Sequence, residues 1–341
     1  MGKRYTLLTL LVFFAVAAFA ACGLQADTEE SWPAKDEQEE RKENIVVGFS
    51  QVGSESDWRI ANSESFRQAF TEKNGYYLIF EDAQQKQENQ LKAVRDFILQ
   101  EVDYIVLDPI VETGWEGVLQ EAKEAEIPVI LADRLLEVED ENLYTCWVGS
   151  DFEEEGRKAG SWLIQYLEEQ DRSEEPINIV TIQGTLDSSA QIGRTKGFQE
   201  ILEGQANWNM LEKSSGDFTQ AKGKEVMEDY LEKYEDIDVV ICENDNMAFG
   251  AIDAIKKAGK TCGSEGDIVL ISFDAVPAAL EAMQRGELNV TIECNPYLGS
   301  KVSDIIKKLE KGDKVEKIYY VEESYFDTSM DLKSIIKERT Y

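Results

Sequence analysis

From residue 45 onward, short apolar runs alternate with stretches whose apolar residues recur every three or four positions. The runs read IVVGFS, YYLIFED, DYIVLDP, PVILADR, INIVTIQG, DVVICEND and DIVLISFD. They are rich in β-branched residues and almost continuously apolar, which is typical of strands that are covered on both faces. Between two of them, Leu91, Val94, Ile98 and Val102 form one apolar stripe of a helix. The alternation predicts repeated β-α units, and therefore an α/β fold with parallel sheets and helices on both faces.

The pattern runs twice along the chain. The first series ends near YTCWVGSD and the second begins near INIVTIQG, so we expect a crossing at residues 149–151. After NVTIECN, one helical stretch and the run KIYYVEESYF are too little for a third domain. We therefore expect the chain to cross back, complete the first lobe and return once more. The predicted lobes are residues 45–148 with 296–322 and residues 149–295 with 323–341, two doubly wound Rossmann-like lobes with a cleft between them.

The N-terminus has the layout of a secretory signal, in which two basic residues precede an apolar stretch at 7–21. The stretch closes on FAAC, which resembles a bacterial lipobox. We predict that residues 1–22 are a lipoprotein signal and that Cys22 is lipidated; ordinary cleavage after Ala20 is the alternative. Residues 23–44 are polar and highly charged, which predicts an acidic flexible linker. The expected location is extracytoplasmic, with a lipid anchor in the cell membrane.

Composition excludes several classes of function. The chain of 341 residues has 68 acidic against 35 basic residues, a formal charge of −33, which repels nucleic acid. It contains no histidine, so it has no imidazole base and no histidine-ligated metal. Its cysteines form no CxxC motif, and a disulfide among them stays open; they are Cys22, Cys146, Cys242, Cys262 and Cys294. We expect no cofactor and no metal.

Polar side chains gather where the predicted strands end. In open parallel sheets these carboxyl ends face the ligand crevice. The residues at such ends are Ser54, Glu55, Asp108, Asp133 and Arg134 in the first half, and Asn244 and Asp274 in the second. An acid after a strand is often only a helix cap. Capping does not explain why the pattern recurs in both halves, so we predict that these residues bind a ligand, except Asp108, whose role stays open.

Two aromatic residues and three arginines fit the same cleft. Trp58 follows the first strand of one half, and Phe218 follows a strand of the other. If both project into the cleft, they can sandwich the apolar face of a sugar ring; the alternative is packing under their own lobes. Arg59, Arg134 and Arg194 can each fork across neighbouring hydroxyl oxygens, so we assign them to ligand contact as well.

Together these residues resemble a known family. The segments GFSQVGSESDWR, DAQQKQENQLKAVR, PIVETGWEGVL, AKEAEIPVILADR, QGTLDSSAQIGRTKGF, SGDFTQAKGKEVME, NDNMAFGAI and ISFDAVPAALEAMQRGE look like the periplasmic sugar-binding proteins of ABC transporters, and most like the galactofuranose-binding type. The resemblance covers residue 45 to the C-terminus. It implies the type I periplasmic binding protein fold, in which a three-segment hinge lets two lobes close on one sugar. It also implies a monomer that delivers the sugar to a membrane permease.

The resemblance also assigns site residues. Ring contacts fall at Trp58, Asp133, Arg134, Arg194, Phe218, Asn244 and Asp274, and the loop with Ser54, Glu55 and Arg59 carries selectivity. This sequence departs from its relatives at Asp108 and Glu243. Where ribose-type binders place a glutamine, Glu293, Cys294 or Asn295 would have to serve.

The leading hypothesis is therefore a non-enzymatic solute-binding lipoprotein of an ABC importer. One alternative is a sensor that presents the sugar to a membrane receptor or kinase. Another is a glycosidase that uses two acids such as Asp133 and Asp274. A sugar-responsive transcription regulator is the weakest, because it needs a basic helix-turn-helix segment and the N-terminus instead offers an export signal and an acidic stalk.

Overall fold

The computed structural model describes residues 44–264, 266–339 and 341. The predicted signal, Cys22 and nearly all of the linker lie outside this part. The first series of elements comprises β1 (Ile45–Gln51), α1 (Asp57–Ala69), β2 (Tyr76–Asp82), α2 (Gln87–Leu99), β3 (Tyr104–Leu107), α3 (Glu116–Glu124), β4 (Val129–Ala132) and β5 (Cys146–Gly149). Two short 3-10 turns, at Glu72–Asn74 and Glu141–Leu143, interrupt its connections.

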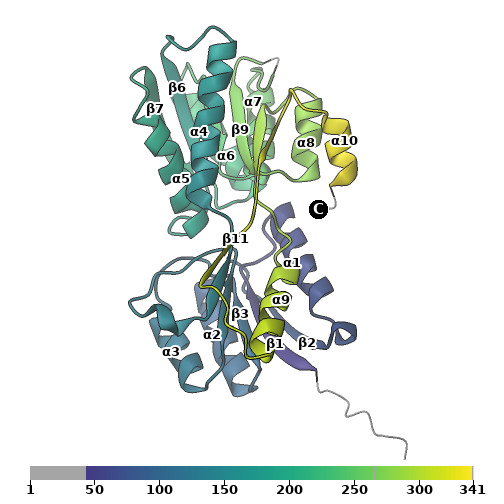
Figure 1. Ribbon diagram of the computed structural model, residues 1–341. Helices are drawn as coiled ribbons and strands as arrows, with labels where there is room; N and C mark the ends of the chain where they lie inside the picture. The colour runs from purple at the N-terminus through teal and green to yellow at the C-terminus, as the bar shows by residue number, and fades with distance from the viewer. Residues whose placement is uncertain (1–43, 265, 340) are drawn as a thin grey trace, which may run out of the picture. The chain divides into compact units, whose positions relative to one another are not determined.

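The second series and the C-terminal return follow. They comprise α4 (Phe152–Glu169), β6 (Ile177–Gln183), α5 (Ser189–Leu202), β7 (Trp208–Ser215), α6 (Gln220–Lys233), β8 (Val239–Cys242), α7 (Asp245–Lys257), β9 (Val269–Asp274), α8 (Pro277–Gln284), β10 (Val290–Glu293), α9 (Gly299–Glu310), β11 (Ile318–Tyr320), β12 (Tyr325–Asp327) and α10 (Leu332–Glu338). Figure 1 shows these elements along the chain.

The strands form two six-stranded sheets with the orders β11-β5-β4-β3-β1-β2 and β12-β10-β9-β8-β6-β7. All strand pairs are parallel except β10 with β12. The predicted fold class, two doubly wound α/β lobes, is confirmed. Because β11 joins the first sheet and β12 the second, the chain passes between the sheets three times: at 149–151, after β10, and between β11 and β12. The residue boundaries of the lobes stay a prediction.

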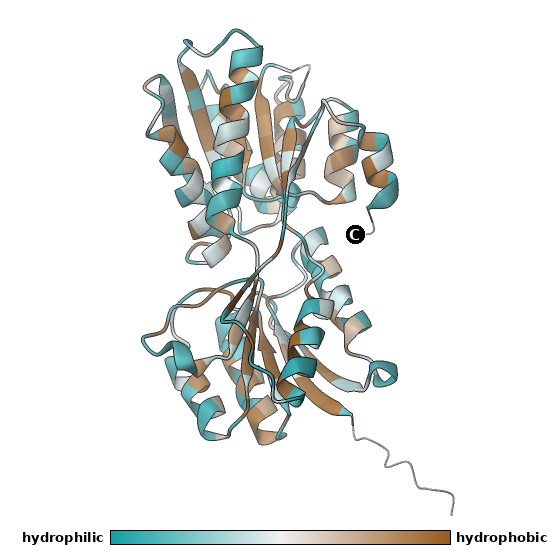
Figure 2. Cartoon of the chain, viewed as in Figure 1, coloured by the Kyte–Doolittle hydropathy of each residue, from teal (hydrophilic) through white to brown (hydrophobic). Residues whose placement is uncertain are grey.

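Each sheet is covered on both faces, which explains why the strands are apolar throughout. The first sheet packs against α2 and α3 on one face and α1 and α9 on the other. The second packs against α4 and α5 on one face and α6, α7 and α8 on the other. Figure 2 shows hydrophobic strands inside and helices that are hydrophilic on their outer sides. Among the described residues, no helix is both long and apolar enough to cross a membrane.

Helix caps place several predicted site residues at the carboxyl ends of the strands. Ser56 caps α1 by accepting from the backbone N–H of Arg59 (3.1 Å), so Trp58 and Arg59 lie in the first helical turn and not in a loop. Thr219 caps α6 directly after Phe218. Asn244 caps α7 by accepting from the N–H of Met247 (2.9 Å). These caps satisfy helix N–H groups and also fix where the neighbouring side chains point.

Candidate functional site

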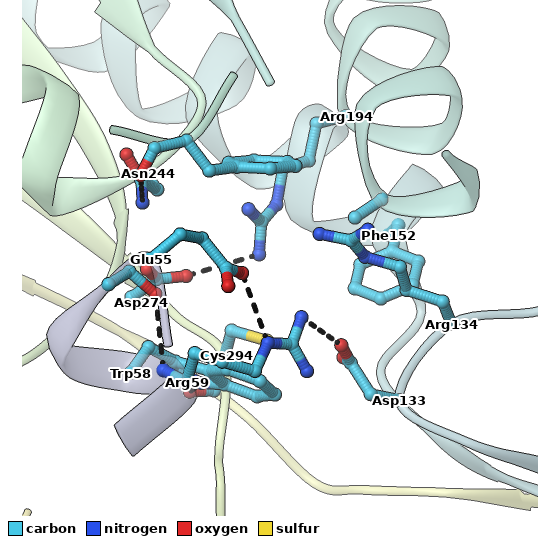
Figure 3. A pocket seen from close by; sticks show the side chains of 13 residues that line it. Glu55, Trp58, Arg59, Asp133, Arg134, Phe152, Arg194, Asn244, Asp274 and Cys294 are labelled. Atoms are coloured by element: carbon cyan, nitrogen blue, oxygen red, sulfur yellow. Dashed lines mark hydrogen bonds and ion pairs between the residues drawn. The ribbon is translucent and has the colours of Figure 1, made fainter. Parts of the chain in front are cut away.

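A cavity lies between the carboxyl ends of the two sheets. It is lined by Glu55, Ser56, Trp58, Arg59, Asp133, Arg134, Phe152, Ala190, Arg194, Phe218, Asn244, Asp274 and Cys294. Figure 3 shows these side chains converging from both lobes.

The structure brings nine of the ten predicted ligand-binding residues to this cavity. The tenth, Ser54, is exposed, and its hydroxyl donates to Asp82 Oδ2 (3.3 Å) outside the cavity. The first-strand loop therefore reaches the cavity only from Glu55 onward.

In the first lobe, Arg59 holds a buried group of carboxylates. Its Nε donates to Glu55 Oε1 (3.2 Å), its Nη2 to Asp133 Oδ2 (2.9 Å), and its Nη1 to Asp108 and to Gln51 Oε1 (3.2 Å). Burial raises the pKa of Asp108 well above its ordinary range, and the Arg59 guanidinium opposes only part of that shift. Arg59 therefore orients the carboxylates of the site, because each of its nitrogens already has a partner in the protein.

In the second lobe, Arg194 has the corresponding position. Its Nε donates to Glu155 Oε2 (2.7 Å), its Nη2 to Asp274 Oδ1 (3.4 Å), and its Nη1 to the carbonyl of Glu243. Burial raises the pKa of Asp274 well above its ordinary range, and Arg194 lowers it again in part. Each lobe thus presents carboxylates that an arginine holds in place.

Arg134 differs from the other two arginines, because it makes few bonds to the protein. Its Nη1 donates to the carbonyl of Ile110 (3.0 Å), while its buried Nε has no hydrogen-bond partner. Burial, and secondarily the charge of Arg59, lower its pKa. The guanidinium lies 5.2 Å from the ring centre of Phe218, which belongs to the other lobe. Arg134 is therefore the cavity's best-placed free donor.

Trp58 is covered by the opposite lobe. Its ring is 4% exposed and packs in the apolar cluster that contains Phe152 and Phe218 of the second lobe. Its Nε1–H donates to the carbonyl of Cys294 (2.7 Å). Because Cys294 directly follows β10 of the second sheet, this bond and the packing disfavour the alternative that Trp58 lies under its own lobe.

Further hydrogen bonds join the lobes around the cavity. The N–H of Asp57 donates to Asn246 Oδ1 (3.1 Å), that of Glu112 to the Asp187 carbonyl (2.9 Å), and that of Leu135 to Ser189 Oγ (2.9 Å). These contacts describe lobes that are closed on each other.

Three residues of the cavity have left-handed backbone conformations. The φ angles are 59° at Asp133, 59° at Phe218 and 102° at Asp274. Such values are uncommon for residues other than glycine and are concentrated at functional sites. All three residues line the cavity, Asp133 after β4, Phe218 after β7 and Asp274 at the end of β9.

Sequence reasoning did not assign several residues that complete the site. Ser56, Phe152 and Ala190 line the cavity, and Glu155 lies behind Arg194. Cys294 also lines it and was one of the three residues expected where ribose-type binders place a glutamine. Phe152 follows the first crossing, as Trp58 follows β1, so its position after a strand was an available signal. Glu155 carried none, because it lies within an acidic run at 153–155. Among the described residues, the buried atoms without a hydrogen-bond partner include Glu55 Oε2, Asp108 Oδ1 and Arg134 Nε.

Two Rossmann-like lobes that enclose a small polar cavity define a class of solute-binding proteins. Residues 47–314 match the periplasmic binding protein domain, and the chain belongs to that family. The resemblance seen in the sequence is confirmed.

Several similar proteins bind or are named for particular sugars. The chain is 44% identical over 278 residues to the galactofuranose-binding protein YtfQ of Escherichia coli (strain K12), covering 80% of this chain and 85% of that one. A crystal structure from Mycobacterium smegmatis in complex with β-D-fucofuranose matches with a TM-score of 0.82 at 40% identity, over 86% of this chain and 94% of that one. The periplasmic binding protein component of the arabinose ABC transporter from Shewanella sp. ANA-3, bound to α- and β-L-arabinofuranose, has a TM-score of 0.78 at 40% identity, over 87% and 99%.

Proposed function

We propose that this protein is the extracytoplasmic sugar-binding component of an ABC importer, and that it binds a furanose, with galactofuranose as the first candidate. The observation that carries the proposal is the closed cavity, in which Trp58 and Phe218 come from opposite lobes and meet arginine-held carboxylates. Aromatic faces suit the C–H surface of a sugar ring, and carboxylates and arginines suit its hydroxyls. Of the three relatives described above, one is named a galactofuranose-binding protein, and the other two are structures with a bound furanose.

The residues proposed to bind the sugar are those that line the cavity. Arg134 donates to ring or exocyclic hydroxyls, since its Nε is free. Asp133 and Asp274 accept from hydroxyls, and Arg59 and Arg194 hold them in place. Ser54 has no direct contact in this proposal.

The mechanism is closure of the two lobes about the three crossing segments. The ligand touches both lobes only in the closed form, so it stabilises that form over the open one. A membrane permease then recognises the closed protein. We propose that the protein works as a monomer, is anchored through lipidated Cys22, and performs no chemistry on its ligand.

The first experiment is thermal unfolding of the purified protein with a panel of sugars. The panel contains galactofuranose, galactose, ribose, arabinose, xylose and glucose. Methyl galactofuranoside and methyl galactopyranoside are added as a matched pair in which the ring form is fixed. A ligand present at about 100 times its dissociation constant stabilises by roughly 2.7 kcal/mol. We expect stabilisation by the furanoside and none by the pyranoside.

The variant Arg134→Ala is the matched control for the site. It should lose the stabilisation by sugar and keep the unliganded unfolding temperature. Equal stabilisation by both ring forms would contradict furanose selectivity. A panel without any shift, or a sugar released from added glycosides, would contradict the proposed function.

A further inference from the structure

The three segments that cross between the sheets meet at one buried carboxyl. Glu323 lies on the third crossing, and its Oε1 accepts from the hydroxyl of Ser150 on the first crossing (2.6 Å). The same oxygen accepts from the backbone N–H of Asn295 on the second crossing (2.6 Å). The hinge therefore has a single polar centre that all three crossings share.

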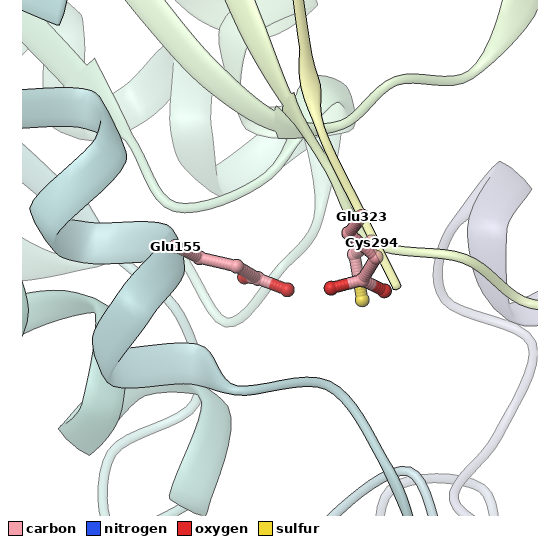
Figure 4. Close-up of side chains that lie close together, drawn as sticks. All are labelled: Glu155, Cys294 and Glu323. Atoms are coloured by element: carbon pink, nitrogen blue, oxygen red, sulfur yellow. The ribbon is translucent and has the colours of Figure 1, made fainter. Parts of the chain in front are cut away.

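Two further donor groups face this centre. One ligand atom each of Glu155, Cys294 and Glu323 lie within 4.8 Å of one another. Figure 4 shows the Glu155 carboxylate, from the first turns of α4, pointing across to the other two side chains. The three residues are far apart in sequence, so no spacing motif predicts the cluster.

One atom of this group lacks a partner. Glu155 is completely buried, its Oε2 accepts from Arg194, and its Oε1 has no hydrogen-bond partner. A buried carboxylate oxygen without a partner is costly, and a bound cation would give it one.

We propose that Glu155, Cys294 and Glu323 form a binding site for one divalent metal ion of the zinc type. Zn²⁺ accepts both thiolate sulfur and carboxylate oxygen, and most of its sites are four-coordinate. Hard ions such as Mg²⁺ and Ca²⁺ avoid the sulfur of cysteine. The three side chains supply three ligands, and a water supplies the fourth. The ligand atoms, which lie within 4.8 Å of one another, need to move closer together to reach zinc–ligand distances of about 2.0 to 2.3 Å.

The surroundings of the three ligands suit a doubly charged cation. As ligands the three side chains carry negative charge, and Arg194, which is paired with both Glu155 and Asp274, offsets only part of it. A divalent cation would offset the negative charge of the ligands further. Hydrogen bonds outside the ligands hold Glu323 in place: Ser150 and Asn295 bond its carboxyl, and the Lys158 ammonium donates to its backbone carbonyl (2.8 Å). Such outer contacts are typical of sites that orient their ligands.

The site differs in role from the sugar-binding site, although it adjoins it. Cys294 also lines the cavity, which gives a cation a route to the three ligands. Because the ligands follow or lie on the crossings, a bound cation ties the hinge segments together. The proposal does not rest on the identity or the binding of a sugar.

The test is metal binding by the purified protein after treatment with a chelator. Calorimetry with Zn²⁺ should show one saturable site. The Zn²⁺ affinity should fall at least tenfold in Glu323→Gln. This variant can still accept from Ser150 and Asn295, so it should fold. Titration with Co²⁺ should produce the near-ultraviolet absorption of a thiolate–cobalt bond.

The matched control is a second buried cysteine. Cys262 lies elsewhere, with its Sγ 3.3 Å from the carbonyl of Glu287. The cobalt–thiolate absorption should disappear in Cys294→Ala and persist in Cys262→Ala. The proposal is overturned if wild-type protein gives no such absorption, if Cys294→Ala retains it, or if Glu323→Gln binds Zn²⁺ as tightly as wild type.

Discussion

Glu243 provides a sharp test of the electrostatics behind the cavity. Its carboxyl is buried, and Oε2 accepts from the backbone N–H of Gly184 (2.7 Å) while Oε1 accepts from the hydroxyl of Thr195. Burial raises its pKa from 4.5 to about 7, and the two hydrogen bonds lower it only in part. The change we consider is Glu243→Gln, which keeps the shape and cannot ionise.

The sign follows from proton binding. The native protein binds the proton of the Glu243 carboxyl more tightly than the unfolded chain does. The protonated carboxyl therefore contributes its full stabilisation below the unfolded pKa of 4.5, and this stabilisation is lost as pH rises through the native pKa of about 7. One pKa unit corresponds to about 1.4 kcal/mol, so the whole effect is on the order of 3 kcal/mol. Roughly 2 to 3 kcal/mol of it is lost between about pH 5 and pH 8.

The assay is denaturant unfolding of both proteins at several pH values across this window. Other buried acids also titrate, so the informative quantity is the difference between wild type and Glu243→Gln. The free energy of unfolding of the variant should fall less from pH 5 to pH 8, by about 2 kcal/mol. The control is Glu72→Gln at an exposed position, which should follow wild type. If Glu243→Gln shows the wild-type slope, the carboxyl ionises freely and the reasoning is refuted.

Three further predictions concern sugar affinity and unfolding. Trp58→Phe keeps an aromatic ring but loses the bond to the Cys294 carbonyl, so the sugar affinity measured by calorimetry should fall about fivefold. Trp58→Ala should lower the free energy of sugar binding by about 1 to 3 kcal/mol. An equal loss of stability without sugar would show that Trp58 is a core residue. Arg194→Ala leaves the buried carboxylates of Glu155 and Asp274 without their arginine and should lower the free energy of unfolding by about 3 to 5 kcal/mol. Arg134→Ala should lower only the sugar affinity. Identical melting curves for the two variants would contradict this distinction. Asn246→Ala removes one interlobe acceptor and should weaken binding by about 0.5 to 1 kcal/mol, and unchanged affinity would show that the bond does not contribute to closure.

The fold was predictable because its signal is repeated and local. Runs such as IVVGFS and DIVLISFD are almost continuously apolar, as strands covered on both faces are, and they form β1 and β9. The strands β11 and β12 are less clear in sequence, because each has only three residues and Tyr319 and Tyr325 are only half-buried. That the C-terminal run divides between the two sheets depends on distant partners, β5 and β10.

The site was predictable where it depends on strand ends, and less so where it depends on backbone conformation. Asp133 and Asp274 follow strands, so topology alone directs them to the cleft. The left-handed φ of Asp133 leaves no mark in the sequence. Nor does the sequence show that Arg59 is occupied by carboxylates while Arg134 Nε has no partner, because the carboxylates around Arg59 include Asp108, which follows β3 far along the chain. Glu155 contributes from a helix, where an acid usually indicates only a solvated surface.

The unpaired atoms of the closed cavity explain why closure should need a ligand. Glu55 Oε2 and Arg134 Nε are buried without hydrogen-bond partners, and the ring of Phe218 lies over the Arg134 guanidinium from the other lobe. In an open protein water can reach these atoms, so closing without a ligand costs about 1 to 3 kcal/mol for each of them. A sugar hydroxyl can donate to the carboxylate and accept from the guanidinium, and this removes the penalty. The same atoms that make the empty closed form unfavourable thus make the liganded closed form specific, which is the difference that a permease needs to distinguish them.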